Sequence, residues 1–158
     1  MTNDPSLQIR LATIEDEDFI VSLIPRLTEF GPPPWRYVPD MTEYDILIIL
    51  KSLHEQPEGT VIFIAEDENQ APLGFIHLFL GSDYYYKEKH ANISDLIIAK
   101  DAEGRGAGQK LLQKGEEWAR SHGFHWITLS VFAQNQRARD LYQRMGYGED
   151  IMKYVKEL

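Results

Sequence analysis

The sequence contains no cysteine, and this absence excludes several kinds of site at once. Without thiols the chain has no disulfide framework, no cysteine nucleophile and no thiolate metal site. The absence also fits a reducing compartment, so we expect a cytoplasmic location. His122 and His125 have a spacing that could chelate a metal, but Gly123 interrupts the helix pattern between them and no acidic partner is near. We therefore expect no metal site.

Positive charge is scarce as well. The chain has 16 Lys and Arg against 25 Asp and Glu, which gives a net charge of -9. Nucleic acids and anionic membranes are bound by basic surfaces, so this balance argues against both as partners. No apolar run approaches the length of a membrane span, and the start of the chain lacks a secretion-signal pattern. A cationic partner, such as an amine, suits the acidic balance better.

The 158 residues, of which 43% are hydrophobic, are typical of a globular protein, and we expect residues 1–158 to form one domain. Pro25 should kink or end the first helix, and residues 31–39 should form a stiff, exposed loop. Alternating and helical spacings of apolar residues predict a regular set of elements. We expect strands at 7–12, 60–65, 73–80, 91–98, 124–132 and 148–158, and helices that begin near Thr13, Thr42, Gly108 and Asn135.

The strongest signal lies in residues 95–112, where a buried strand is followed by a glycine loop and then by a helix. Gly104, Gly106 and Gly108 alternate with other residues just before the helix. The first N–H groups of a helix have no partner within it, and the helix dipole favours an anion there. Glycines have no Cβ, so phosphate oxygens can approach the backbone. The stretch therefore predicts a phosphate or pyrophosphate seat.

The spacing fits neither of two common nucleotide loops. In the dinucleotide pattern G-x-G-x-x-G the third glycine would stand at Gln109, but here it falls one place early, at Gly108. In the ATP-binding P-loop a Ser or Thr would follow the lysine, and here Leu111 follows Lys110. A glycine-rich turn without a ligand is the remaining alternative, and the entropic cost of three glycines argues against it.

Two motifs resemble the GNAT superfamily of acyl-CoA-dependent N-acyltransferases. The first, Glu103-Gly-Arg-Gly106-Ala-Gly108, is similar to the family's pyrophosphate motif. The second, Asn135-Gln-Arg-Ala138-Arg-Asp-Leu141-Tyr142-Gln-Arg-Met-Gly146-Tyr147, resembles the family's N-x-x-A-x-x-L-Y-x-x-x-G-[FY] helix. One position departs: Glu103 stands where the family usually has Gln or Arg. A carboxylate there disfavours a nearby pyrophosphate, and we expect Arg105 to compensate.

The resemblance implies an α/β fold with a mixed, mostly antiparallel sheet flanked by helices and splayed between the fourth and fifth strands. Acetyl-CoA would lie in the gap as co-substrate. Its pantetheine arm would pair with the backbone of Ile97, Ile98 and Ala99. Asn135 would touch the arm as well as cap its helix. The pyrophosphate would rest on the loop residues Gly104, Arg105, Gly106, Ala107, Gly108 and Gln109.

The reaction that the resemblance implies is direct transfer of an acetyl group to a primary amine in a ternary complex. Tyr142 would be the general acid, because a phenol of pKa ~10 is protonated at neutral pH and can donate to a departing thiolate whose conjugate acid lies near ~8.5. Asp95, a charged residue in a buried strand, would be the general base that deprotonates the amine. Alternatively Asp95 pairs with a basic group or faces water. His90 is a weaker candidate for the base.

The acceptor and its pocket are left open by the sequence. Trp35 and Tyr37 could contact the acceptor or simply pin a proline-rich loop, and packing is the favoured interpretation. Tyr84, Tyr85 and Tyr86 could form a pocket wall or a dimer contact; a homodimer stays open. We interpret His77, inside a strand, as a structural residue. A non-catalytic acyl-CoA-binding sensor or partner-binding module is the rival hypothesis: Tyr142 argues against it and Glu103 for it.

Overall fold

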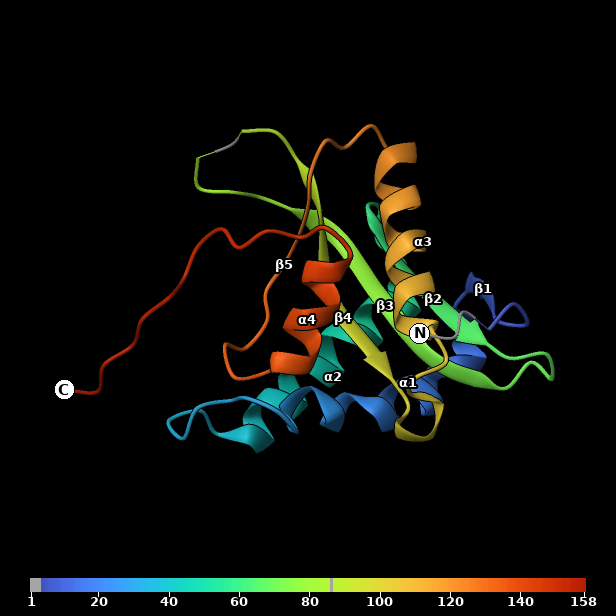
Figure 1. Cartoon of the computed structure of the whole chain (residues 1–158), viewed down its shortest axis with the longest axis horizontal. Helices are drawn as coiled ribbons and strands as arrows, with labels where there is room; N and C mark the ends of the chain where they lie inside the picture. Colours follow the sequence, from blue (N-terminus) through green and yellow to red (C-terminus); the bar gives the residue numbers. More distant parts are fainter. Residues whose placement is uncertain (1–3, 86) are drawn as a thin grey trace.

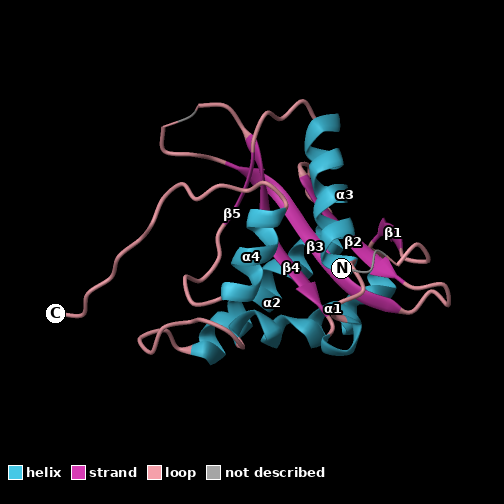
Figure 2. Cartoon of the chain, viewed as in Figure 1, coloured by secondary structure: helices cyan, strands magenta, loops and turns pink. Residues whose placement is uncertain are grey.

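The computed structural model describes residues 4–85 and 87–158, and it is built on a five-stranded sheet with the order β1-β2-β3-β4-β5 (Figures 1 and 2). The first four strands pair antiparallel, and β5 runs parallel to β4. The strands are β1 Gln8–Leu11, β2 Thr60–Glu66, β3 Pro72–Gly81, β4 His90–Ile98 and β5 Ile127–Leu129. The predicted α/β fold with a mixed, mostly antiparallel sheet is therefore confirmed.

Helices cover both faces of this sheet. The helices are α1 Glu17–Leu23, η2 Ile24–Thr28 (a 3-10 helix), α2 Val38–Glu55, α3 Ala107–Ser121 and α4 Gln136–Arg144, with short 3-10 turns η1 Ile14–Asp16 and η3 Lys100–Ala102. Side chains alternate along a strand, so Ile62 and Ile64 of β2 pack with α1 and α2, whereas Phe63 and Ala65 pack with α3. Among the described residues, no helix is long and apolar enough to cross a bilayer.

The sheet splays between β4 and β5, as expected. The two strands pair only from Ala91 to Ile93 on one side and from Ile127 to Leu129 on the other. A β-bulge marks the point of separation: Asp95 lies opposite His77 and Ile93 opposite Leu78, so Ser94 is the extra residue. A bulge bends its strand and re-aims the neighbouring side chains. The bulge thus turns Asp95 and the end of β4 toward the gap.

The first helical region confirms one expectation and corrects another. The α-helix ends at Leu23 and the chain continues through Pro25 as the 3-10 helix η2, as the proline predicted. However, α2 begins at Val38 rather than at Thr42. Pro39 occupies the first turn of α2, where the missing N–H of proline costs nothing, so the loop that we expected to reach Pro39 is shorter.

Two predicted strands are wrong in extent or in kind. The strand expected at 124–132 is only Ile127–Leu129. After the pair of Ile93 with Leu129, β4 and β5 diverge, so residues 130–132 have no ladder partner in the described chain. Residues 148–158, expected as a last strand, form no helix or strand and are exposed. An extended segment is a strand only when another strand satisfies its N–H and C=O groups. No described strand lies beside this C-terminal segment.

Candidate cofactor and acceptor site

The gap between β4 and β5 is the mouth of a cavity of about 600 Å³, which we call the cofactor cavity. Its walls come from β4, the glycine loop, α3, β5 and α4. The cavity brings together most of the residues that the sequence predicted: Asp95, Ile97, Ile98, Gly104, Gly106, Ala107, Gly108, Gln109, Asn135 and Tyr142. Ala99 and Arg105 do not line it. The backbone N–H of Ala99 donates to the carbonyl oxygen of Leu73 at 2.8 Å, so that group is already used inside the sheet.

The glycine loop points the N-terminus of α3 at the cofactor cavity. Gly104 and Gly106 have φ angles of 80° and 87°, in the left-handed region that favours glycine. Gly106 directly precedes Ala107, the first residue of the 15-residue helix. The N–H groups of the first turn have no partner within α3, and the helix dipole adds positive potential there. This end of the cavity is suited to a phosphate or pyrophosphate.

Gly108 also has a packing role. A Cβ at this position would lie 3.5 Å from Leu141 Cδ2 and 3.8 Å from Ile98 Cγ1. These are ordinary contact distances, so the side of α3 that carries Gly108 lies directly against β4 and α4. Gly108 therefore lies where α3, β4 and α4, three of the elements that form the cavity walls, meet.

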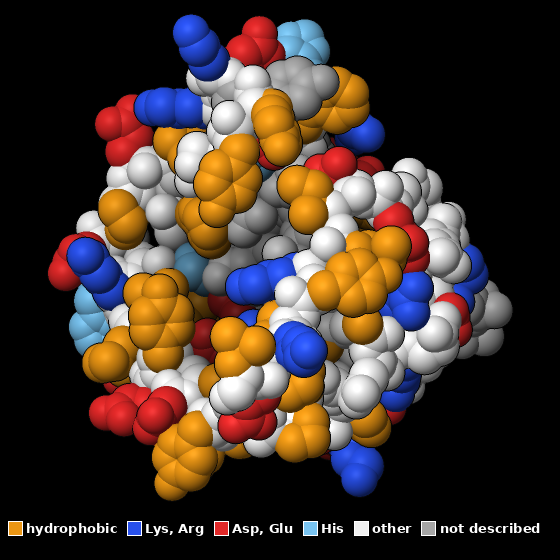
Figure 3. Space-filling view, turned by 90° about the vertical axis from the view of Figure 1, so that its left-hand side faces the viewer, with side chains coloured by type: hydrophobic (Ala, Val, Ile, Leu, Met, Phe, Trp, Pro, Cys, Tyr) orange, Lys and Arg blue, Asp and Glu red, His pale blue; other side chains and the backbone are white. Residues whose placement is uncertain are grey.

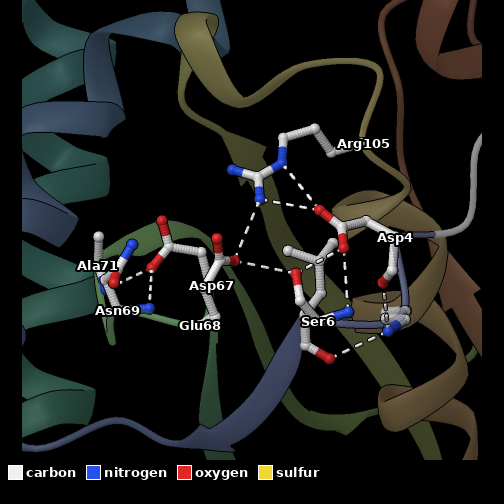
Figure 4. Close-up of polar contacts among 9 residues, drawn as sticks. Asp4, Ser6, Asp67, Glu68, Asn69, Ala71 and Arg105 are labelled. Carbon is white, nitrogen blue, oxygen red and sulfur yellow. Dashed lines mark hydrogen bonds and ion pairs between the residues drawn. The ribbon is translucent and has the colours of Figure 1, made fainter.

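The two basic residues of the loop region are directed away from the cofactor cavity, against our expectation for Arg105. Figure 4 shows the guanidinium of Arg105 turned toward Asp4, with Nη2 at 2.9 Å from Oδ2 of Asp4 and at 3.9 Å from Oε2 of Glu68. Lys110 Nζ donates to the carbonyl oxygens of Asp4 and Leu7, at 2.9 and 3.0 Å. Both cations thus fasten residues 4–7 to the glycine loop, and the Arg105 side chain does not compensate Glu103.

Two other arginines neutralise Glu103. Arg26 Nη2, from η2, lies 2.5 Å from Oε1 of Glu103, and Arg137 Nη1, from α4, lies 2.5 Å from Oε2. Arg137 first, and then Arg26, lowers the pKa of the Glu103 carboxyl below its usual value. All three side chains line the cofactor cavity. Arg26 has a longer ion pair with Glu29, at 3.8 Å, while its Nη1 is buried without a hydrogen-bond partner among the described atoms.

The sequence-based prediction missed both arginines. Arg137 stands two residues after Asn135 in the second motif, so its place on the first turn of α4 could have been anticipated. Nothing in the local sequence marks Arg26, because only the packing of η2 against β4 brings it to the cavity. On the cavity wall two guanidiniums face one carboxylate, so the charge that Glu103 brings does not leave the phosphate end negative.

Tyr142 is positioned by a capped helix. Asn135 Oδ1 accepts a hydrogen bond from the backbone N–H of Ala138 at 3.2 Å, which is the expected N-cap. Tyr142 lies two turns along α4 and lines the cofactor cavity. Burial, and then the nearby Asp95 carboxylate, raises the pKa of the Tyr142 phenol to about 12. The hydroxyl is therefore protonated throughout the neutral range and can act as a proton donor.

Asp95 is only 7% exposed and is hydrogen-bonded to His77, which is 1% exposed. His77 Nδ1 lies 3.0 Å from Oδ2 of Asp95, and Nε2 lies 2.9 Å from Oγ of Ser52 on α2. A carboxylate only accepts, so Nδ1–H donates to Asp95, and Nε2 of a neutral ring accepts from the Ser52 hydroxyl. Both ring nitrogens are used, which supports the structural interpretation of His77. His77 is thus the basic group with which Asp95 pairs, as one of the two sequence-based alternatives predicted. Asp95 also lines the cofactor cavity.

A second cavity, of about 580 Å³, meets the first at Asp95; we call it the acceptor cavity. Its walls carry two further carboxylates, Asp45 and Glu58, and the aromatic rings of Tyr44 and Phe79. Asp45 also lines the cofactor cavity. Burial, and then the charge of Asp95, raises the pKa of Asp45 to about 6. Figure 3 shows a hollow near the centre of the face toward which the C-terminal segment projects, with hydrophobic side chains around it.

The aromatic residues that the sequence offered for the acceptor do not line either cavity. Trp35 and Tyr37 are exposed, as are Tyr84 and Tyr85 on the loop between β3 and β4. Tyr86 lies outside the described residues. His90, the weaker candidate for the base, is buried at the start of β4 and lines neither cavity.

Comparison with known proteins identifies the family of this chain. A family model described as the acetyltransferase (GNAT) family matches residues 22–147. The chain belongs to the GNAT acetyltransferase family. This acyltransferase is 31% identical over 144 residues to YhfO, an uncharacterized N-acetyltransferase of Bacillus subtilis, covering 91% of each chain. The resemblance of the two sequence motifs to this family is thereby confirmed.

Solved structures agree on the GNAT fold. A putative acetyl transferase from Pyrococcus furiosus superposes with a TM-score of 0.75 at 29% identity, covering 96% of this chain and 99% of that one. AAC(6')-Iy, solved in complex with the bisubstrate analogue CoA-S-monomethyl-acetylneamine, superposes with a TM-score of 0.70 at 18% identity, covering the same shares of the two chains. The second likeness concerns the fold alone.

Proposed function

We propose that the enzyme transfers an acetyl group from acetyl-CoA to a primary amine by direct attack in a ternary complex. The observation that carries the proposal is the meeting of two cavities at Asp95. One contains a helix N-terminus suited to pyrophosphate and a protonated phenol, and the other contains two further carboxylates suited to a cationic amine. An acidic wall attracts an ammonium ion and raises its local concentration.

The residues present fit acetyl-CoA. The first turn of α3, together with Arg26 and Arg137, would hold the pyrophosphate, because guanidinium groups and helix N-termini both bind phosphate. After the bulge, no strand of the described chain pairs with β4 on the side that faces β5. Backbone groups of Ile97 and Ile98 lie in this stretch, so an extended pantetheine arm could add to β4 like a strand.

Each proton has a place in this scheme. Asp95 accepts the proton that the ammonium must lose before its nitrogen attacks the carbonyl carbon. Backbone N–H groups near Ile98 stabilise the oxyanion, and the C–S bond then breaks. Tyr142 donates its proton to the departing sulfur, and the second proton that the nitrogen loses as the amide forms restores the phenol. In this scheme the amine attacks the acetyl group directly, so no covalent enzyme intermediate forms. The chain has no cysteine nucleophile, and the hydrogen-bonded pair of Ser52 and His77 in the acceptor cavity takes no part in the transfer.

Calorimetric titration tests the cofactor half of the proposal. Acetyl-CoA should bind saturably, whereas ATP and NAD should not. Replacing Arg137 by alanine should weaken acetyl-CoA binding about tenfold, which corresponds to ~1.4 kcal/mol for one charge-assisted contact. Arg120→Ala is the matched control, because Arg120 is an exposed arginine outside both cavities whose loss should leave binding unchanged.

Absence of acetyl-CoA binding to the wild-type protein would contradict the proposal. The rival hypothesis of a non-catalytic acyl-CoA-binding module drew its support from Glu103. That support is weakened, because Arg26 and Arg137 neutralise this carboxylate.

Asp45 provides a test of the acceptor half. Its pKa of about 6 means that the carboxyl is neutral below this pH and ionised above it. Amines stay cationic in this range, so KM for the acceptor amine should fall as the pH rises through about 6. In Asp45→Asn this pH step should disappear, and KM near pH 7.5 should rise about tenfold, as expected when one ionic contact is lost.

The matched control for this test is Asp40→Asn, an exposed position in the first turn of the same helix that lines neither cavity. It should keep both KM and its pH step. An Asp45→Asn variant with an unchanged KM and pH profile would show that the ammonium does not approach this carboxylate.

A further inference from the structure

A cluster of charged and polar side chains lies against the glycine loop but outside both cavities. Figure 4 shows its position, where residues 4–7, the glycine loop and the turn between β2 and β3 come together. We call this cluster the N-terminal clamp. Its side chains are those of Asp4, Ser6, Glu68, Arg105 and Lys110, and none of them lines the cofactor cavity or the acceptor cavity. The clamp joins distant segments, since Asp4 and Arg105 are 101 positions apart.

The carboxylate of Asp4 is the centre of the clamp. Its Oδ2 accepts from Arg105, at 2.9 Å from Nη2 and 3.3 Å from Nε. Its Oδ1 accepts from the backbone N–H of Ser6 at 3.0 Å and from the Ser6 hydroxyl at 2.5 Å. Hydrogen bonds from Ser6, and then the one from Arg105, lower the pKa of the Asp4 carboxyl to about 2. The carboxylate is therefore ionised, and the ion pair with Arg105 is present, throughout the neutral range.

Asp4 is itself held in place from two sides. Leu7 is 5% exposed and belongs to the same core cluster as Leu111 of α3. Lys110, in the first turn of α3, donates to the carbonyl oxygens of Asp4 and Leu7. A buried side chain and a lysine thus fix residues 4–7 to the helix that the glycine loop precedes. For this reason Asp4 is a fixed acceptor for Arg105.

The glycine loop needs such a support because of its own composition. Arg105 stands between Gly104 and Gly106, which both have positive φ angles. A Cβ at Gly104 would meet no atom within 4 Å, so a side chain would find open space there. Glycine loses more backbone freedom on ordering than any other residue, and fixing one residue costs about 1–2 kcal/mol. Arg105 is the side chain through which this stretch can be fastened to the rest of the protein.

We infer that Asp4 and Arg105 are positioning residues for the cofactor. Their ion pair holds the glycine loop in the shape that receives the pyrophosphate, and it raises the affinity for acetyl-CoA without contact with it. The entropy of ordering the loop is then lost on folding and not on binding. This inference rests on the proposed function, because it takes the pyrophosphate of acetyl-CoA as the ligand of the loop.

Replacing Asp4 by asparagine separates positioning from electrostatics, because the two effects have opposite signs. Removal of a negative charge near an anion site should, by charge alone, strengthen acetyl-CoA binding. Loss of the ion pair should instead weaken binding about three- to fivefold, the range expected for a partly exposed pair. Calorimetry measures Kd, and KM for acetyl-CoA should rise by the same factor while kcat at saturation stays unchanged. Asp4→Glu keeps a carboxylate and should bind more tightly than Asp4→Asn.

The effect of Asp4→Asn should depend on the arginine. In an Arg105→Gln background the ion pair is already lost, so Asp4→Asn should no longer weaken acetyl-CoA binding. The charge control is Asp101→Asn, which removes an exposed carboxylate from η3, close to the loop in sequence and outside the clamp. It should leave the affinity equal to that of the wild type or slightly higher.

Hydrogen exchange gives a measurement that needs no ligand. The backbone amides of residues 103–109 should exchange faster in Asp4→Asn than in the wild type, because the loop opens more often. Amides in the centre of β3 should exchange at the wild-type rate, and a thermal melt should show that the variant is folded.

The outcomes distinguish this inference from the proposed function. If the wild type binds acetyl-CoA and Asp4→Asn binds it as tightly or more tightly, the inference is wrong and the proposed function stands. Unchanged exchange of the loop amides in Asp4→Asn would also overturn the inference. A wild-type protein that does not bind acetyl-CoA would overturn the proposed function, and the inference with it.

Discussion

Replacement of Tyr142 by phenylalanine is expected to lower kcat about 10²- to 10⁴-fold, the usual range for the loss of a general acid. Acetyl-CoA binding should stay close to that of the wild type, because the ring still packs against the core and only the hydroxyl is lost. The pKa of about 12 keeps this hydroxyl protonated in the wild type, so its proton is available at any neutral pH. Steady-state kinetics combined with calorimetry would separate the two effects.

Tyr147→Phe is the matched control for this substitution. Tyr147 packs its tilted ring beside that of Tyr142 and also has a partly buried, protonated hydroxyl, but it does not line the cofactor cavity. Its loss should weaken only the contact with Glu116. If Tyr142→Phe were as active as Tyr147→Phe, the leaving sulfur would take its proton from water and the role assigned to Tyr142 would be wrong.

Asp95→Asn is expected to lower kcat by about 10²-fold or more, because an amide cannot take the proton of the ammonium. The rate should recover in part at high pH, where more of the amine reaches the site already deprotonated. The substitution should also cost about 1–3 kcal/mol of stability, since His77 loses its charged acceptor in the core. Rates measured against pH, together with thermal melts, would report both effects.

The control separates a base from a structural carboxylate. Asp16 is equally buried and receives two hydrogen bonds from Arg10, at 2.8 and 2.9 Å, but it lies outside both cavities. Asp16→Asn should therefore lose stability without losing kcat. An Asp95→Asn enzyme that melts earlier and keeps its kcat would reduce Asp95 to a partner of His77.

The features that sequence predicted well are those set by local chemistry. Alternating glycines before a helix dictate a left-handed backbone at Gly104 and Gly106 and an open helix N-terminus, whatever the rest of the fold does. Asn135 likewise caps α4 through a bond to a residue three positions on. For this reason the phosphate end of the site and the position of Tyr142 could be anticipated from short stretches of the chain.

The features that sequence missed depend on packing between distant segments. Arg26 and Glu103 are 77 positions apart, and only the docking of η2 beside the glycine loop joins them. Asp45 becomes part of the site because α2 brings its carboxylate near Asp95, and no local pattern predicts this proximity. The expectation that Arg105 compensates Glu103 was wrong because of other contacts between distant segments. The guanidinium of Arg105 lies beside the carboxylates of Asp4 and Glu68 and is held there, away from Glu103.

Strands are a third case, because a strand is a property of two segments. Residues 124–132 and 148–158 both have the composition of strands, yet each needs a neighbour to become one. In the isolated chain β4 leaves β5 after three pairs, and the C-terminal segment meets no strand. Composition could therefore not show that 124–132 is a strand over three residues only and that 148–158 is none, because both outcomes depend on neighbouring segments.

Glu103 would preorganise the two arginines that we propose for the pyrophosphate. Two guanidiniums from separate elements would repel each other if they were brought together without an anion, and each would keep its own hydration and rotamer freedom. The carboxylate holds Arg26 and Arg137 in place in advance, so the entropy of ordering them is lost during folding rather than during each catalytic cycle. In the proposed cycle the pyrophosphate would compete with this internal anion for the two arginines. The competition would reduce the affinity for the cofactor and would ease its release, because the carboxylate would bind the arginines again.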